Sequence, residues 1–121
     1  MTTLTEGRYA GEHLISEASG TRSRDVVTLV VGQNLPAGAV LGKITASGKH
    51  TLLAPAATDG SEVAAAVLFA PVNASAADKA AVVTARDTEV HGACLTWPAG
   101  IDAGDKAGAT AELKALGIVI R

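Results

Sequence analysis

Short apolar runs rich in β-branched residues, separated by turn-forming residues, recur from Val26 to Trp97, and this pattern most constrains the fold. Such runs, bounded by Gly, Pro, Asn and Asp, are typical of β-strands. EHLISE, residues 12–17, can form one further short strand in the polar N-terminal segment. We therefore expect a mainly β domain with strands over residues 26–31, 39–45, 50–54, 62–72, 79–85, 89–97 and 118–120.

The spacing of apolar residues changes near the C-terminus, before the last expected strand. Ala109, Leu113 and Leu116 stand at i, i+4 and i+7, so they would share one face of a helix. Asp102 can cap the start of this helix, and Gly117 suits the position just after its end. The sequence therefore predicts one short C-terminal helix.

The stretch NLPAGAVLGKI, residues 34–44, raises the question of whether its glycines shape a ligand site or turn the chain. Pro36 fixes φ near the value that turns use, and Gly38 permits positive φ. The stretch 34–44 contains almost no polar side chain that could bind a ligand. We interpret the stretch as a turn between two strands.

The composition limits how much apolar area this chain can bury by itself. Apolar residues make up 48% of the 121 residues, but aromatic residues make up only 2%, and alanine supplies much of the apolar count. Alanine buries little area, so a core of Ala and Val gains less from burial than one of Leu and Phe. A partner subunit would supply the missing burial, which favours an oligomer.

Charge and segment composition argue against several classes of partner. The net charge is −2 without a basic stripe, so we expect no nucleic acid partner. No apolar run approaches the roughly 20 residues of a membrane-spanning helix, and no signal peptide is recognisable, so we expect no membrane partner. Cys94 is the single cysteine, which excludes an internal disulfide and suits synthesis in a reducing cytoplasm.

Two regions of different composition indicate the domain organisation. Residues 1–25 are polar, mixed and without strong periodicity, so we interpret them as a flexible N-terminal arm. Residues 26–121 carry the strand and helix patterns and are expected to form a single β-rich domain.

No group of residues has the spacing that catalysis or metal binding requires, so we expect no enzyme and no cofactor. His91 and Cys94 form an HxxC pair, but residues i and i+3 of a strand face opposite sides unless Gly92 forms a bulge. Asp59, in TDGS, is either a catalytic carboxylate or one half of an Asp-Gly turn, and no second carboxylate or histidine accompanies it. We favour the turn.

Two further groups have both a structural and an interaction interpretation. Arg22 and Arg24 would point the same way on an extended chain, and they either grip an acidic partner or flank the first strand in solvent. Trp97, Pro98 and Phe69 are candidates for core anchors or for residues of a subunit interface.

Four segments in order resemble the head decoration protein family of tailed bacteriophages, the lambda type. They are EGRYAGEHLISEASGTRSRDVVTLVVGQNLPAGAVLGKITASGKHTLLAP, TDGSEVAAAVLF, CLTWPAGI and ELKALGIVIR. The resemblance implies a compact β-clip-like fold and a homotrimer on the outer surface of the expanded phage head. It also implies a cementing role in which the N-terminal arm contacts the major capsid protein. Synthesis would take place in the cytoplasm of a bacterial host.

The same resemblance assigns capsid contact to the arm, without saying which side chains make it. The candidates within residues 1–25 are Arg8, Tyr9, His13, Leu14, Ile15, Arg22 and Arg24. Two alternatives remain open at this point. One is a β-clip module that binds a small acid or nucleotide near Asp59 or His50, or acts on it as an enzyme. The other is a trimeric assembly subunit unrelated to capsids.

Overall fold

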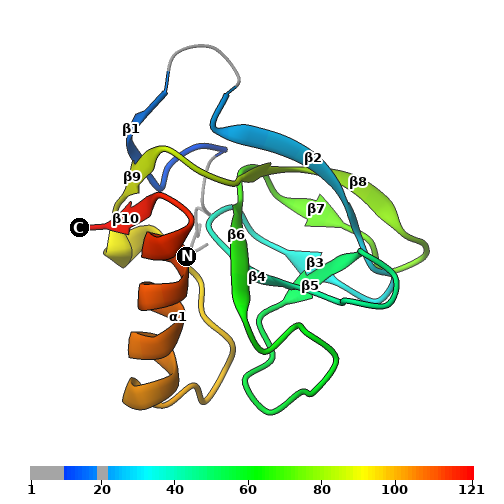
Figure 1. Cartoon of the computed structure of the whole chain (residues 1–121). Coiled ribbons are helices and arrows are strands. Elements are labelled where there is room, and N and C mark those ends of the chain that lie inside the picture. The colour runs from blue at the N-terminus through cyan, green and yellow to red at the C-terminus, as the bar shows by residue number, and fades with distance from the viewer. Residues whose placement is uncertain (1–9, 19–21) are drawn as a thin grey trace, which may run out of the picture.

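A computed structural model describes residues 10–18 and 22–121 of the chain (Figure 1). These residues form ten strands, a 3₁₀ turn at Gly92–Cys94 and one α-helix, α1 (Ala103–Ala115). The strands are β1 (Leu14–Glu17), β2 (Arg24–Leu29), β3 (Asn34–Leu35), β4 (Val40–Lys43), β5 (His50–Leu52), β6 (Ala64–Leu68), β7 (Val72–Asn73), β8 (Lys79–Thr84), β9 (Thr88–Val90) and β10 (Ile118–Ile120). The predictions of a mainly β fold and of one C-terminal helix are confirmed.

Five strands close into a barrel in the order β2-β5-β4-β6-β8. All neighbouring pairs are antiparallel except β2 and β5, which run parallel and share only the pair Leu29 and His50. The barrel is therefore closed at one point along this seam, and the N-terminal part of β2 continues beyond β5. A short antiparallel pair, β3 and β7, lies beside the barrel strands.

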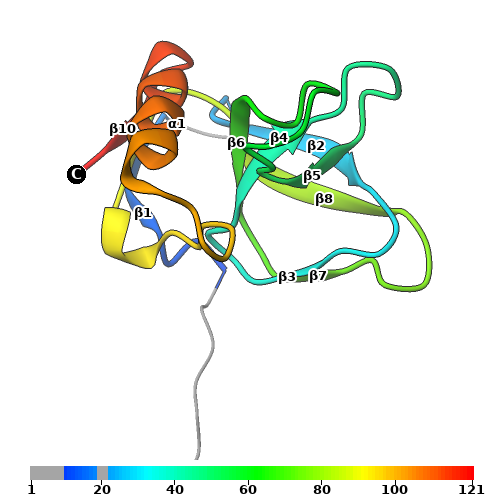
Figure 2. The same ribbon diagram turned by 90° about the horizontal axis from the view of Figure 1, so that it is seen from below.

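A second layer lies beside the barrel (Figures 1 and 2). It consists of α1 and a three-stranded sheet in the order β1-β9-β10, with β10 parallel and β1 antiparallel to β9. The first described strand and the last strand of the chain thus flank the same central strand. This arrangement fixes the N-terminal segment beside the C-terminus.

The pair β4 and β6 is a wall shared by two apolar cores, because successive residues of a strand face opposite sides. Leu41 and Leu68 face the barrel core, which also contains Leu29, Leu35, Ala39, Ala66, Ala74, Ala81 and Val83. Val40 and Val67 face the helix core, which also contains Leu53, Ala64, Val90, Leu95, Ala109, Leu113 and Ile118. Alanine and valine are frequent in both cores, as the composition implied.

The helix begins and ends where the sequence predicts. The Asp102 carboxylate accepts a hydrogen bond from the Asp105 backbone N–H, 2.7 Å away, and Gly117 follows the helix with φ of 91°. Ala109 and Leu113 are buried against the helix core, as predicted. The prediction for Leu116 is wrong: it is the C-terminal capping residue and is 44% exposed, because the chain turns away there toward β10.

The expected strands over 39–45, 50–54 and 79–85 are each shorter in the structure, and two others are interrupted. The apolar stretch 62–72 divides into β6 and β7, with a bend before Pro71, whose ring removes a backbone donor from the ladder. The stretch 89–97 leaves the sheet after Val90 and forms the 3₁₀ turn at Gly92–Cys94. A Cβ at position 92 would lie 3.0 Å from the Ile120 side chain, so glycine allows β10 to approach closely there.

The N-terminal segment packs on the body further than the arm prediction implied. Residues 14–17 form β1, as expected for EHLISE, and residue 25 lies inside β2. The interpretation of these described residues as a flexible arm is wrong, because backbone pairing and buried side chains hold them. Residues 1–9 and 19–21 lie outside the described residues.

Candidate functional site

The N-terminal segment is fixed to the body by a buried histidine. His13 is 1% exposed, and its Nε2 lies 3.0 Å from Thr84 Oγ1 on β8. Burial lowers the pKa of His13 to about 4, with nearby Glu17 acting in the opposite direction. The ring also meets Phe69 edge-on at a centroid distance of 6.2 Å. The structure therefore places His13 in the interior of the described body.

A second contact joins β1 to the start of β2. The Glu17 carboxylate accepts hydrogen bonds from Ser23 Oγ at 2.7 Å and from the Arg24 guanidinium. These two donors hold the pKa of Glu17 below its usual value, the Arg24 contribution being the larger. The Arg24 guanidinium also lies over the Phe69 ring, 4.0 Å from its centroid. Arg24 and Phe69 thus pack against each other as structural residues of the body.

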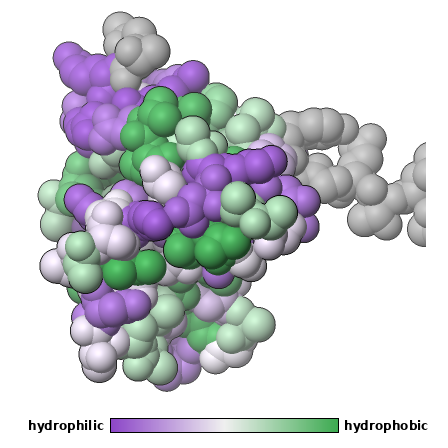
Figure 3. Space-filling model, turned by 90° about the vertical axis from the view of Figure 1, so that its right-hand side faces the viewer, coloured by the Kyte–Doolittle hydropathy of each residue, from purple (hydrophilic) through white to green (hydrophobic). Residues whose placement is uncertain are grey.

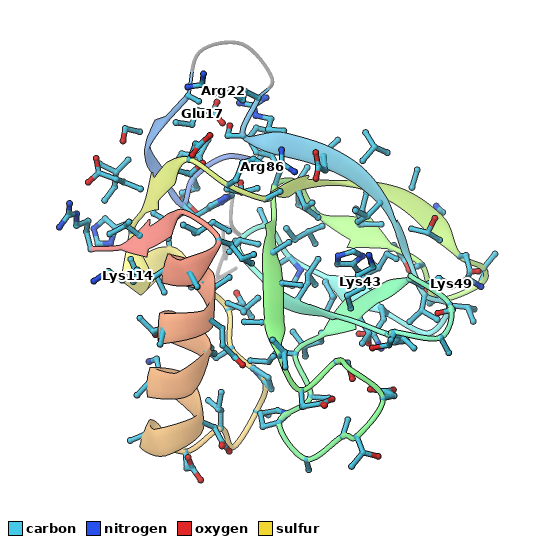
Figure 4. All side chains as sticks on the ribbon, viewed as in Figure 1. Glu17, Arg22, Lys43, Lys49, Arg86 and Lys114 are labelled. Atoms are coloured by element: carbon cyan, nitrogen blue, oxygen red, sulfur yellow. The ribbon has the colours of Figure 1, made fainter. Side chains whose placement is uncertain are left out.

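The two candidate arginines face different side chains, so they do not form one binding site together. Arg24 faces Glu17 and Phe69, whereas Arg22 is 70% exposed and lies 3.6 Å from the Asp87 carboxylate. Figure 4 shows Arg22 and Glu17 at the same end of the molecule. The two apolar candidates for capsid contact differ in exposure. Leu14 is half-buried opposite Val90, whereas Ile15 is 50% exposed. Arg22 and Ile15 remain available to a partner, and Arg8 and Tyr9 lie outside the described residues.

Trp97 and Pro98 are half-buried at the edge of the helix core. The Trp97 indole packs against this core, and the Lys106 ammonium lies 5.4 Å from its ring centroid. This geometry fits the anchor interpretation of Trp97. An interface role for Trp97, Pro98 and Phe69 stays a prediction.

The stretch 34–44 turns the chain, as interpreted. Gly38 has φ of 87°, and its N–H donates to the Leu68 carbonyl at 2.8 Å. A Cβ at Gly42 would collide with the Ser61 carbonyl, so this second glycine allows a close backbone approach. Both glycines therefore serve the packing of β4.

The remaining chemical candidates have structural roles. The Asp59 carboxylate accepts hydrogen bonds from the Ser61 N–H and hydroxyl, which is the pattern of an Asx turn. His91 caps the 3₁₀ turn through Nδ1, 3.3 Å from the Ala93 N–H. Within residues 10–18 and 22–121, no group of three His, Cys, Asp or Glu could hold a metal ion.

The structure reveals one cavity that sequence reasoning did not find as a whole. It lies at one mouth of the barrel and brings Lys43 and His50 together with Asp25 and Arg86. Of these four residues, the sequence indicates only His50 as the possible site of a small acid. Lys43 is close to it in sequence, but Asp25 and Arg86 are distant and no motif joins the four, so only the barrel topology places them together.

Comparison with known protein families decides where this chain belongs. The family model of bacteriophage lambda head decoration protein D matches residues 3–118. The chain belongs to this family. A comparison with curated individual proteins found no match.

Membership defines the general role of the chain. As a head decoration protein it is a structural component of the phage virion that binds the capsid. In the part of the chain that the structure describes, no helix has the length and apolar character to cross a bilayer. The match spans both the N-terminal segment and the two cores, so the whole fold carries the family signature.

Proposed function

We propose that this decoration protein is a cement for the phage head. It binds as a homotrimer to the outside of the expanded shell, contacts the major capsid protein and stabilises the shell against the pressure of packaged DNA. The observation that carries the proposal is the family match over residues 3–118. The finer points rest on the resemblance and on the geometry of the N-terminal segment.

Residues 13–17, which follow the proposed arm, are held on the folded body. This suits a segment that transmits force between the shell and the body. β1 pairs with β9, His13 is buried and Glu17 binds Ser23 and Arg24. A force on residues 1–9 would therefore act on the folded body through these contacts. This supports an arm of nine residues that joins the shell while residues 14–17 remain on the body.

Main-chain pairing explains how such an arm binds without a conspicuous motif. An extended segment that adds to a sheet edge gains backbone hydrogen bonds and places few demands on its side chains. Three arms on one trimer make the attachment multivalent, so weak contacts combine into firm binding. Arg8 and Tyr9 are the side chains in this segment that we assign to capsid contact.

Exposed valines support self-association. Val26 on β2 is 72% exposed, and its cross-strand neighbour Val82 on β8 is 36% exposed. Figure 3 shows apolar patches divided by polar side chains on the right-hand side of the molecule in Figure 1. Apolar side chains left in solvent by a small core favour burial against a further subunit.

Co-sedimentation with phage heads tests the proposal. We expect the full-length chain to sediment with expanded heads and not with unexpanded heads. Deletion of residues 2–9 removes none of the described contacts, so the shortened chain should fold and self-associate normally but lose at least about tenfold in head binding. Undiminished binding by this variant would refute the role of the arm.

Point variants separate the arm from the body. Simultaneous Arg8→Ala and Tyr9→Ala should weaken head binding less than the deletion, because the main chain remains. The matched control is Arg121→Ala, an exposed arginine that pairs with Glu89 on the body. Equal loss of binding in both variants would contradict a specific contact by the arm.

A further inference from the structure

The barrel has a cavity of about 420 Å³ at one mouth, lined by residues from all five of its strands. Small-molecule sites in proteins commonly have volumes of roughly 300 to 1,000 Å³. The cavity lies where β2 continues beyond its single pairing with β5, so the seam leaves room for it. Its lining includes the apolar residues Val27, Ala65, Ala66, Val83, Ala85 and Leu116.

His50, which lines this cavity, has a buried ring nitrogen without a hydrogen-bond partner among the described residues. His50 is 7% exposed, and the nitrogen is its Nδ1. A buried polar atom is normally hydrogen-bonded, because leaving it unpaired is costly. Burial lowers the pKa of His50, and nearby Lys43 lowers it further against the opposing effect of Asp25. The neutral ring can carry its proton on Nδ1 and donate it to an acceptor.

The cavity is lined by two cations, Lys43 and Arg86, and by two carboxylates, Asp25 and Asp87. Arg86 binds the Asp25 carboxylate, and the Asp87 carboxylate lies 3.6 Å from Arg22. Lys43 takes part in none of the ion pairs within residues 10–18 and 22–121. A guest with a single negative charge would therefore pair with Lys43.

The apolar lining of the cavity favours a ligand that carries a hydrocarbon group as well as a charge. Alanine at positions 65, 66 and 85 leaves space that larger side chains would fill, and Val27 and Val83 complete an apolar surface. Bound inorganic phosphate would not cover this apolar surface, because phosphate has no apolar group. A ligand with a short hydrocarbon chain would cover the surface and remove it from water, which favours binding.

We propose that the barrel mouth is a binding site for a small organic carboxylate. The carboxylate accepts from His50 Nδ1 and pairs with the Lys43 ammonium, and its short apolar body lies on the alanine and valine surface. Such a guest would join β4 and β5 to the facing strands β2 and β8 across the seam. Nothing in capsid binding by the N-terminal arm requires this site, so the two are tested separately.

Titration of the full-length protein with butyrate, followed by NMR of the backbone amides and the His50 ring, tests the proposal. We expect saturable shifts confined to residues around the cavity. Butanamide has the same shape without the charge, and phosphate has charge without the hydrocarbon. Each should bind at least about tenfold more weakly, because a charge-assisted hydrogen bond or the apolar burial is lost. Equal binding of either probe would overturn the proposed chemistry.

Variants locate the site. Lys43→Met should weaken butyrate binding by about tenfold or more. Lys114→Met is the matched control, since Figure 4 shows Lys114 at the end of α1, away from Lys43 in the barrel, and binding should not change. Ala65→Leu, at a half-buried position that lines the cavity, should block binding while the other amide signals show the native fold.

Three results would overturn the proposal. These are shifts that never saturate, shifts away from the barrel mouth, and binding that survives both Lys43→Met and Ala65→Leu. A cavity that holds only water would give the first of these results. None of them affects the head-binding assay, so failure here leaves the cementing role intact.

Discussion

At the scale of the residue, Gly38 is required twice, by its backbone angle and by its neighbour. Its φ of 87° disfavours any side chain, and a Cβ there would collide with the Cys94 carbonyl oxygen. Gly100 has a similar φ of 75°, but a Cβ there would meet nothing within 4 Å. An alanine variant at Gly100 therefore measures the destabilisation due to positive φ alone, and one at Gly38 measures that destabilisation together with the steric collision.

We predict that Gly38→Ala destabilises the protein by more than Gly100→Ala. The angle alone costs about 1–2 kcal/mol in each variant, and the collision in Gly38→Ala adds to it. Urea unfolding of the two variants and the wild type measures the difference. Equal free energies of unfolding for the two variants would show that the chain at Cys94 moves aside without cost.

The buried His13 predicts a dependence of stability on pH. Its pKa is about 4 in the folded chain and 6.5 in the unfolded chain, so the unfolded chain binds more protons between these values. The stability due to neutral His13 is therefore complete above pH 6.5 and is lost as the pH falls toward 4. The difference in pKa corresponds to about 3 kcal/mol. Urea unfolding at several pH values in this window measures it.

The variant His13→Gln isolates this contribution. Glutamine can still reach Thr84 but does not titrate, so the stability of the variant should fall less steeply with pH. Some slope should remain, since burial also lowers the pKa of His50 and the sign is the same. An unchanged slope would contradict the assignment to His13.

At the scale of the element, the docking of β1 depends on the contact between Glu17, Ser23 and Arg24. Glu17→Gln weakens these charge-assisted hydrogen bonds, and partial exposure of the pair reduces the effect to about 1–2 kcal/mol. Glu89→Gln on the adjacent strand is the comparison variant. Glu89 accepts hydrogen bonds from Ser16 of β1 and from Arg121, but these contacts are more exposed, so we expect a smaller loss than for Glu17→Gln.

Hydrogen exchange tests whether this loss is local. We expect Glu17→Gln to speed exchange at the amides of β1 that bond to β9, while the barrel amides keep their protection. A uniform loss of protection would mean that β1 opens only when the whole chain unfolds.

Elements that depend on neighbouring residues were predictable from the sequence, whereas elements that depend on long-range pairing were not. The strand over 79–84 and the helix cap at Asp102 follow from residue type and spacing alone. The docking of residues 14–17 does not, because its partners Thr88 and Val90 lie more than seventy positions away. A polar segment that pairs at long range resembles a free arm when only its own composition is considered.

The barrel-mouth cavity was hidden for the same reason. His50 and Lys43 are close in sequence, but Asp25 and Arg86 join them only through the pairing of β2 with β8 and the closure of the barrel. The capping aspartate and the turn glycines act within a few residues of themselves, which is why sequence reasoning found them. Sites assembled from single residues of several strands have no local pattern to detect.

At the scale of the whole molecule, the shared wall of β4 and β6 predicts that the two cores unfold together. Val67 and Leu68 are neighbours on β6, yet Val67 belongs to the helix core and Leu68 to the barrel core. Loss of one core would release the strand that the other requires. Trp97 packs only against the helix core, so its fluorescence reports on that side of the wall.

We therefore predict that Leu68→Ala, a change in the barrel core, lowers the urea midpoint of Trp97 fluorescence as much as that of far-UV circular dichroism. The expected loss is about 2–5 kcal/mol, as for other buried leucines. Val67→Ala, which removes less volume on the opposite side, should move both signals together by a smaller amount. All measurements need one protein concentration, because self-association would add to the apparent stability. If Leu68→Ala shifted the circular dichroism and left the Trp97 transition in place, the barrel and the helix layer would be separate folding units, and the wall would not couple them.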